Sequence, residues 1–580
     1  MPLFRARHTA ARLIGQNDAM TNFLRPLRCG FAAILLLAAA AVASPQGAGA
    51  QGSGETGILA LLPETATSRH SVSLGETQLA YEAEAGTLPI RQGNGTTTAK
   101  IFYVAYTADD TDENRPLTFV FNGGPGAASA YLNIGALGPR IVAGTSEGSI
   151  PPPPARLVDN PDTWLAFTDL VFVDPVGTGY SRASDPKNDS DFWGVEPDRE
   201  AMAAFIRLYL AQKERTTSPI FLAGESYGGF RAALLAKALP DSSGVALSGV
   251  VMISPALDFS LLFGHQTAQI LPFAVGLPSM AAVNFMRQGV GDRAAMKSRL
   301  KPVEDYALGD YLTALAAGPQ ATRERATGRV AELTGLPPDL VRRRFAAISL
   351  STFASLFERD EGQVLSRYDG AVSGPGIGAD SSFPHGPDPI LDRMGPIWTS
   401  AYVGYLRTEL GFRTDITYRL LNGEISRRWD YGNGGSDQGY ADAMGDLQEA
   451  RAYNPALQVL IAGGYTDLAT PYFASRYLVS QLPPLAGAAP IEIEDYLGGH
   501  MMYLRPDSRR VLTQDVPWAA ERRLWRARLA RVAEWFVAGE QVRRSLGQPE
   551  AFELYGETVI EDPPFVLTGE ADRIDRERSG

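Results

Sequence analysis

The segment Gly224-Glu-Ser-Tyr-Gly228 places a serine between two glycines, each two residues away. It follows the short apolar run 220–223 and precedes a helical pattern that begins at Gly229. Glycines in these positions relieve crowding in a sharp strand-to-helix turn, which lifts the serine hydroxyl clear of the backbone. The N–H groups of the following helix then point to where negative charge develops. The pattern predicts that Ser226 is a nucleophile. An ordinary glycine-rich turn is the alternative, because G-x-S-x-G also arises by chance.

A nucleophilic serine needs a base, and only one histidine has the expected surroundings. The chain contains His8, His70, His265, His385 and His500. Of these, only His500 lies in a glycine loop directly after a late strand-like run, 491–496. Hydrolases with a serine elbow have the chain order serine, acid, histidine. Asp467 stands between the two and directly follows the apolar run 459–462, so it can orient the imidazole. A turn aspartate and a loop histidine are the separate alternatives for Asp467 and His500.

A second glycine-rich loop, Asn122-Gly-Gly-Pro-Gly126, follows the apolar run 117–121. Glycines let backbone N–H groups approach a substrate oxygen without an intervening side chain. The loop is therefore a candidate for the other half of an oxyanion hole. A simple tight turn is the alternative, since Asn, Gly and Pro are common turn residues.

The elements that must position these residues alternate between strands and helices. Apolar strands are expected at 117–121, 170–173, 220–223, 249–253, 457–462 and 491–496, with helices at 196–213 and from 229. This rhythm predicts an α/β fold with a mostly parallel central sheet flanked by helices. This alternation of strands and helices is interrupted by a largely helical cap insertion at 259–450. The α/β core is thereby divided into a first part, 71–258, and a second part, 451–545. A closing amphipathic helix is expected at 518–537 and a frayed tail at 565–580.

The N-terminal segment 1–50 resembles a signal peptide and leader. Arg25 and Arg28 precede an apolar run, 31–43, which is too short to span a bilayer. Small-x-small patterns at 41–43 and 48–50 are candidate cleavage sites, and Met20 is an alternative start. The protein is therefore expected to be exported, periplasmic or extracellular, without a stable membrane anchor. An uncleaved anchor is the alternative.

The composition, net charge and cysteine count exclude several kinds of function. Hydrophobic residues make up 45% and charged residues 20% of the chain, as in soluble globular proteins. Removing the +4 leader from a chain of net charge −12 leaves −16, which argues against nucleic-acid partners. The single cysteine, Cys29, lies in the leader, so cysteine catalysis, disulfides and cysteine-ligated metals are excluded from the mature protein. No metal or other cofactor is expected.

Four motifs in order resemble the serine carboxypeptidases, peptidase family S10 of the α/β-hydrolase superfamily, in a bacterial-type form. They are Asn122–Gly126, Asp174-Pro-Val-Gly-Thr-Gly-Tyr-Ser181, Gly224–Gly228 and Gly499-His-Met501. The similarity runs across roughly 75–540, and the helical insert resembles that family's cap.

The resemblance implies a role for each matching residue. Ser226 would be the nucleophile, His500 the base and Asp467 its partner, while backbone N–H groups of Gly124 and Tyr227 would form the oxyanion hole. The remaining positions, Asn122, Gly123 and Glu225, would bind the free C-terminal carboxylate of a peptide substrate. A glutamate kept protonated by its surroundings can donate a hydrogen bond to such a carboxylate.

Three positions depart from the family pattern. Ala136 stands where members usually carry a second glutamate, Ala127 replaces a frequent cysteine, and Gly464-Tyr-Thr-Asp467 keeps only the last aspartate of Gly-Asp-x-Asp. Because Ala136 breaks the acid pair, a serine esterase or an acyltransferase of the same fold is the second hypothesis. A catalytically inactive envelope binding protein is the third.

Overall fold

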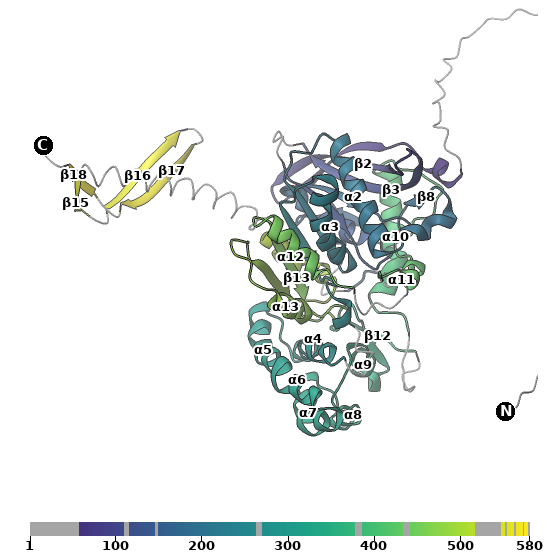
Figure 1. Ribbon diagram of the computed structural model, residues 1–580, viewed down its shortest axis with the longest axis vertical. Helices are drawn as coiled ribbons and strands as arrows, with labels where there is room; N and C mark the ends of the chain where they lie inside the picture. Colours follow the sequence, from purple (N-terminus) through teal and green to yellow (C-terminus); the bar gives the residue numbers. More distant parts are fainter. Residues whose placement is uncertain are drawn as a thin grey trace, which may run out of the picture. The chain divides into compact units, whose positions relative to one another are not determined.

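The computed structural model describes residues 57–109, 115–144, 149–262, 269–377, 386–432 and 441–516, and four strands between 547 and 577 (Figure 1). The expected leader, the closing helix 518–537, and three of the histidines, His8, His265 and His385, lie outside the described residues.

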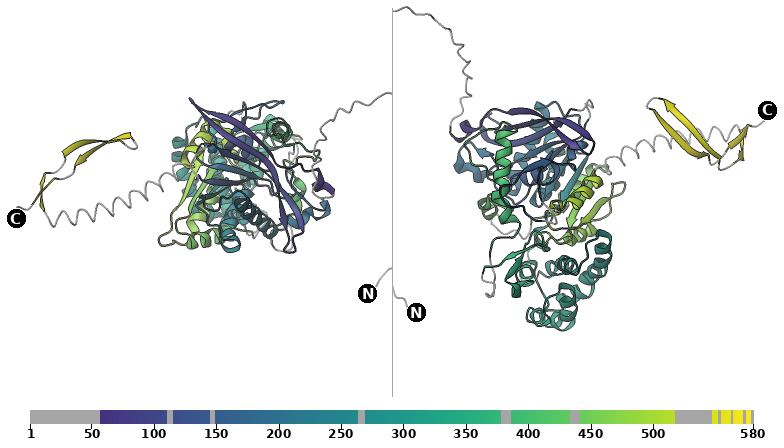
Figure 2. Two further views of the ribbon diagram at one scale, coloured as in Figure 1. Left: turned by 90° about the horizontal axis from the view of Figure 1, so that it is seen from above. Right: turned by 180° about the vertical axis from the view of Figure 1, so that it is seen from behind.

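The centre of the fold is one twisted sheet with the order β1-β2-β3-β7-β4-β9-β10-β13-β14. The strands are β1 (Ala66–Leu74), β2 (Thr77–Arg91), β3 (Thr97–Ala108), β7 (Asp169–Val173), β4 (Leu117–Phe121), β9 (Ile220–Glu225), β10 (Gly249–Ile253), β13 (Gln458–Gly464) and β14 (Ile491–Tyr496). Strands β1 to β3 are antiparallel, and β3 pairs antiparallel with β7. From β7 to β14 every pairing is parallel, which confirms the predicted mostly parallel sheet. Figure 2 shows the long N-terminal strands in purple along one side of this sheet.

The central parallel strands are continuous apolar runs and are buried on both faces. Every residue of β4, β7 and β10 is buried. Alternate side chains enter two different cores: Val120 and Phe172 lie in one, and Phe119 and Val171 in the other.

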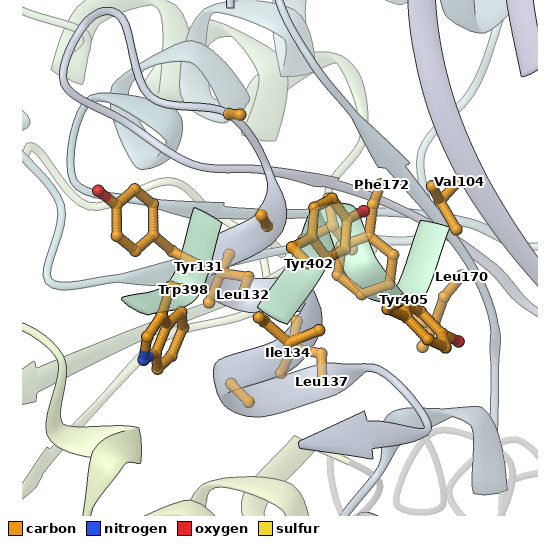
Figure 3. Packing of buried hydrophobic residues seen from close by; sticks show 14 of the residues in the cluster. Val104, Tyr131, Leu132, Ile134, Leu137, Leu170, Phe172, Trp398, Tyr402 and Tyr405 are labelled. Carbon is orange, nitrogen blue, oxygen red and sulfur yellow. The ribbon is translucent and has the colours of Figure 1, made fainter. Parts of the chain in front are cut away.

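Helices cover both faces. The face that carries Phe119 packs against α2 (Val195–Gln212), α3 (Tyr227–Ser243) and α12 (Met444–Tyr453). The opposite face packs against α1 (Ala130–Leu132), the π-helical turn η2 (Asn133–Leu137) and α10 (Leu391–Thr408). Figure 3 shows Tyr402 and Tyr405 of α10 beside Phe172 and Leu170 of the sheet. This layered arrangement, with the serine turn between β9 and α3, is the α/β-hydrolase fold.

The insert divides into two parts. Its first part forms a third core with α13 (Tyr472–Gln481), and consists of α4 (Leu271–Arg287), α5 (Arg293–Tyr306), α6 (Leu312–Ala316), α7 (Pro319–Thr334), α8 (Pro338–Arg343) and α9 (Leu350–Leu356). Helix α4 is at its centre, because all residues from Ala274 to Phe285 are buried. The second part packs on the sheet through α10, α11 (Gly423–Arg428) and α12.

Short strands complete the described structure. The pair β11 (Gln363–Leu365) and β12 (Ser373–Pro375) lies within the insert, and β5 (Arg140–Val142) pairs with β6 (Leu157–Asp159). A two-residue strand, β8 (Arg182–Ala183), pairs with β3. Near the C-terminus, β15 (Gly547–Ala551) pairs with β18 (Ile574–Glu577), and β16 (Leu554–Glu561) with β17 (Pro564–Ala571), in the region that includes the expected frayed tail. In the ranges that the structure describes, no helix has both the length and the apolarity to cross a membrane.

Candidate active site

Ser226 lies at the turn between β9 and α3 with φ +58° and ψ −123°, a conformation that L-residues rarely adopt. Its N–H donates to the carbonyl oxygen of Ile253 at 2.9 Å, at the end of the neighbouring strand. A Cβ on Gly224 would lie 2.0 Å from the oxygen of Gly228, and a Cβ on Gly228 would lie 2.5 Å from the oxygen of Phe121. The two glycines are therefore required by the tight packing of the turn, as the sequence pattern predicts for a nucleophile elbow.

Asp467 and His500 form a buried pair. Oδ2 of Asp467 lies 2.9 Å from Nδ1 of His500, and their side chains are 0% and 3% exposed. The other oxygen of Asp467 accepts the N–H groups of Ala469 and Thr470 at 2.7 and 2.9 Å. A carboxylate held in this way keeps the proton of a neutral imidazole on Nδ1, which leaves Nε2 to accept the serine proton.

Thr470, which no sequence pattern indicates, contacts both members of this pair. Its Oγ1 lies 2.9 Å from Nδ1 of His500, donates to Oδ2 of Asp467 at 2.7 Å, and lies 2.9 Å from the carbonyl oxygen of Ser254. Ser254 directly follows β10, the strand that also receives the N–H of Ser226. The turn at Ser226 and the pair Asp467–His500 are thus both hydrogen-bonded to the same end of β10.

The pKa of His500 is shifted by opposing effects. Burial lowers the pKa of the imidazole, but the Asp467 carboxylate and Glu225 favour its charged form, and the net pKa lies above the ordinary value. Among the described residues, no hydrogen bond joins Ser226 Oγ to His500. Such bonds are often long in free enzymes and tighten when substrate is present.

The loop Asn122–Gly126 lies directly against the serine turn. A Cβ on Gly123 would lie 2.6 Å from the backbone nitrogen of Tyr227 and 2.7 Å from Cβ of Ser226. Gly124 is exposed, with φ +102°, and its bond to Pro125 is cis. The structure therefore brings the two predicted oxyanion-hole residues, Gly124 and Tyr227, into touching segments at the N-terminus of α3.

A distant part of the chain holds this loop in place. The N–H of Asn422 donates to Gly126 O at 2.8 Å, and Oγ of Ser426 donates to Pro125 O at 2.5 Å. On the other side, Arg231 of α3 donates to Asn122 O at 2.9 Å and forms a buried ion pair with Asp198 of α2. No local sequence pattern predicts these contacts.

Glu225 and Asn122 form a second buried group beside Ser226. Nδ2 of Asn122 donates to Oε2 of Glu225, and Oδ1 of Asn122 accepts the N–H of Leu132 at 2.9 Å. The hydroxyl of Tyr503 donates to Oε1 of Glu225 at 2.7 Å. Burial raises the pKa of Glu225 above the ordinary value, although Tyr503 and Asn122 oppose the shift. A raised pKa favours the protonated acid, the form that can donate to a carboxylate.

Ala136 supplies no second acid to this group. It is completely buried in η2, and its carbonyl oxygen accepts a hydrogen bond from Asn160. A Cβ on the adjacent Gly135 would meet the rings of Trp398 and Tyr503. A phenol, not a carboxylate, is therefore the second side-chain partner of Glu225.

A segment of the insert, 366–370, links the loops of Asp467 and His500. Arg367 O accepts the N–H of Leu468, Tyr368 O accepts the N–H of His500, and the N–H of Gly370 donates to Thr466 O. The Asp369 carboxylate accepts Oγ1 of Thr466 at 2.5 Å and Nη2 of Arg505 at 3.2 Å. No motif in the sequence of this segment indicates that it makes these contacts.

Within the described ranges, no cluster of three or more histidine, cysteine, aspartate or glutamate side chains is arranged to hold a metal ion.

Residues 75–270 match the family model described as serine carboxypeptidase. Serine carboxypeptidase-like 44 of Arabidopsis thaliana is 33% identical over 161 residues, which cover 27% of this chain and 30% of that protein. The pheromone-processing carboxypeptidase KEX1 of Yarrowia lipolytica is 31% identical over 181 residues, covering 30% of this chain and 26% of that protein. The chain thus spans about a third of the length of the curated relatives it matches.

Among solved structures, this chain is similar to the prohormone-processing carboxypeptidase Kex1(Δ)p from Saccharomyces cerevisiae. The identity is 15% and the TM-score 0.48, over 76% of this chain and 91% of that chain. The residues matched by the family model include the loop at Asn122 and the elbow at Ser226. Over this segment, the chain is similar to the serine carboxypeptidases, peptidase family S10.

Proposed function

We propose that this protein is an exported serine carboxypeptidase that releases C-terminal amino acids from peptides through an acyl-enzyme on Ser226. The observation that carries the proposal is the position of Glu225. It is a buried acid with a raised pKa, adjacent in sequence to the nucleophile and hydrogen-bonded to Asn122 of the loop that touches the nucleophile turn. A protonated acid in this place can recognise a free carboxylate next to the scissile bond.

In the proposed reaction, Oγ of Ser226 bonds to the last peptide carbonyl carbon while its proton passes to Nε2 of His500. The carbonyl oxygen becomes an anion that the N–H groups of Gly124 and Tyr227 stabilise. His500 then gives the proton to the amine nitrogen, the C–N bond breaks, and the terminal amino acid leaves. Water then attacks the acyl carbonyl carbon with His500 again as base. The ester bond to Oγ breaks, the proton passes from His500 to Oγ of Ser226, and the shortened peptide leaves with a new C-terminal carboxylate.

The test compares matched peptides that end in a free carboxylate or in an amide, with the products followed by mass spectrometry. Stepwise loss of C-terminal residues from the free-acid peptides, with much slower cleavage of the amides, is the expected result. Ser226→Ala is the control for contaminating peptidases. Equal rates on both peptides would contradict carboxypeptidase action.

The buried Ala136 favours one alternative on the same fold, a serine esterase or an acyltransferase, because it adds no acid for carboxylate recognition. That function predicts turnover of simple esters without a preference for a free carboxylate. The peptide comparison, extended to an ester of the same acyl group, separates the two functions.

Export is the second part of the proposal, and the leader sequence is what supports it. Basic residues, a short apolar run and small residues occur in the order of a signal peptide. We expect the mature protein in the periplasmic or extracellular fraction, beginning after Ala43 or Ala50. N-terminal sequencing of the purified protein tests this, and a mature chain that retains residues 20–50 would contradict it.

A further inference from the structure

Tyr503 connects the base loop to the acid beside the nucleophile. It lies in the short helix η8 (Met502–Leu504), three residues after His500, and its hydroxyl is 2.7 Å from Oε1 of Glu225. Both side chains are buried, at 0% and 3% exposure. One loop therefore supplies both the base and a hydrogen-bond partner for Glu225.

The two side-chain partners of Glu225 differ in what they can do. The orientation of the Asn122 amide is set by Leu132, whose N–H donates to Oδ1, so that Nδ2 faces Glu225 and can only donate. A phenol hydroxyl can donate or accept. Tyr503 is therefore the partner that can also accept a hydrogen bond from protonated Glu225, whereas the Asn122 amide group that faces Glu225 can only donate to it.

The neighbouring tyrosines do not have this contact. Tyr131 is also buried near Glu225, but its hydroxyl has no hydrogen-bond partner among the described residues. The ring of Tyr503 lies against the turn that contains Ala136, since a Cβ on Gly135 would be 3.3 Å from its Cε2. Tyr503 thus lies beside the turn in which Ala136 occupies the position of the second glutamate of the serine carboxypeptidase pattern.

We propose that Tyr503 is a positioning residue that sets the orientation and proton affinity of Glu225, and so determines the preference for substrates with a free C-terminal carboxylate. The inference rests on the proposed function. Glu225 acts on the substrate, and Tyr503 acts through Glu225.

The direction of the expected pH effect follows from the groups around Glu225. Burial raises its pKa, as does Asp467, while His500, Tyr503 and Asn122 lower it. Tyr131 and Tyr368 also face it and are neutral, because burial raises their own pKa values. Removing the Tyr503 hydroxyl removes a donor to the ionised acid, so the pKa of Glu225 rises further.

The test is Tyr503→Phe in the full chain, with Tyr311→Phe as the matched control. Tyr311 is equally buried and donates to Ala346 O at 2.8 Å within the separate core formed by α4 to α9 and α13. Fluorophosphonate labelling and thermal unfolding report whether each variant is folded with an active serine. KM and kcat are then measured against pH for a free-acid peptide and its amide.

We expect Tyr503→Phe to be labelled like wild type but to raise KM for the free-acid peptide about threefold or more at the wild-type pH optimum. The alkaline limb of its KM profile moves to higher pH, while the amide peptide and Tyr311→Phe are unaffected. An unchanged pH limb, or an equal loss on both peptides, overturns the proposal. If the proposed function itself is wrong, wild type shows no preference for the free acid, a result that does not depend on the variant.

Discussion

The backbone N–H of His500 donates to the carbonyl oxygen of Tyr368 at 2.5 Å, and the Tyr368 ring meets the imidazole edge-on, with centroids 5.2 Å apart. A residue of the helical insert therefore contacts the proposed base through both its backbone and its side chain. Since the same segment also binds the loop of Asp467, the geometry of the acid–base pair depends on how the insert folds.

This dependence can be tested at Asp369, whose buried carboxylate binds Thr466 and Arg505. Asp369→Asn keeps the size but weakens both contacts, which should reduce the free energy of unfolding by about 1–3 kcal/mol. We expect kcat to fall roughly 10- to 100-fold with little change in KM, because small displacements of catalytic groups slow chemistry more than binding. Asp507→Asn is the control, since its ion pair with Arg510 is at the surface. An unchanged kcat would contradict the idea that the insert holds Asp467 and His500 in place.

Ser226→Ala should abolish labelling by a fluorophosphonate, which bonds to the serine oxygen. Gel fluorescence of the labelled protein measures this directly, and thermal unfolding should show that the variant remains folded. Ser242→Ala, which removes an exposed hydroxyl of the same helix, should label like wild type. Full labelling of Ser226→Ala would place the nucleophile elsewhere.

Glu225→Gln should change the pH dependence of the base. In the pH range where Glu225 is ionised, its charge favours the charged imidazole and so raises the pKa of His500, and a neutral glutamine removes that effect. His500 must be neutral to accept the serine proton, so the acid limb of the labelling rate should move to lower pH. Glu332→Gln, at an exposed position on α7, is the control. A limb that stays in place or moves to higher pH would show that Glu225 does not act on His500.

Gly224→Ala should disrupt the nucleophile turn, because the added Cβ would lie 2.0 Å from the oxygen of Gly228. We expect a loss of about 1–3 kcal/mol in unfolding free energy and a strong loss of labelling. Gly328→Ala on α7 has no atom within 4 Å of its new Cβ and should be stabilising by up to about 1 kcal/mol. Comparable stability of the two variants in chemical denaturation would contradict the packing argument.

The sequence by itself determined the parallel sheet and the identity of the three candidate catalytic residues. Apolar runs bounded by glycine turns are local signals, and the chain order of Ser226, Asp467 and His500 follows from the fold that those runs specify. The need for glycine at position 224 is also local, since its added Cβ would meet Gly228 and Gly229, whereas the need at Gly228 comes from Phe121, which is distant in the sequence.

Only the tertiary structure decided which residues support these three. Tyr503 reaches Glu225 across 278 residues of sequence, and Thr466 reaches Asp369 across 97. It also placed α10, α11 and α12 on the sheet instead of with the other helices of the insert. Contacts of this kind have no periodicity or spacing along the chain, because they arise where separate elements meet at the carboxyl ends of the strands.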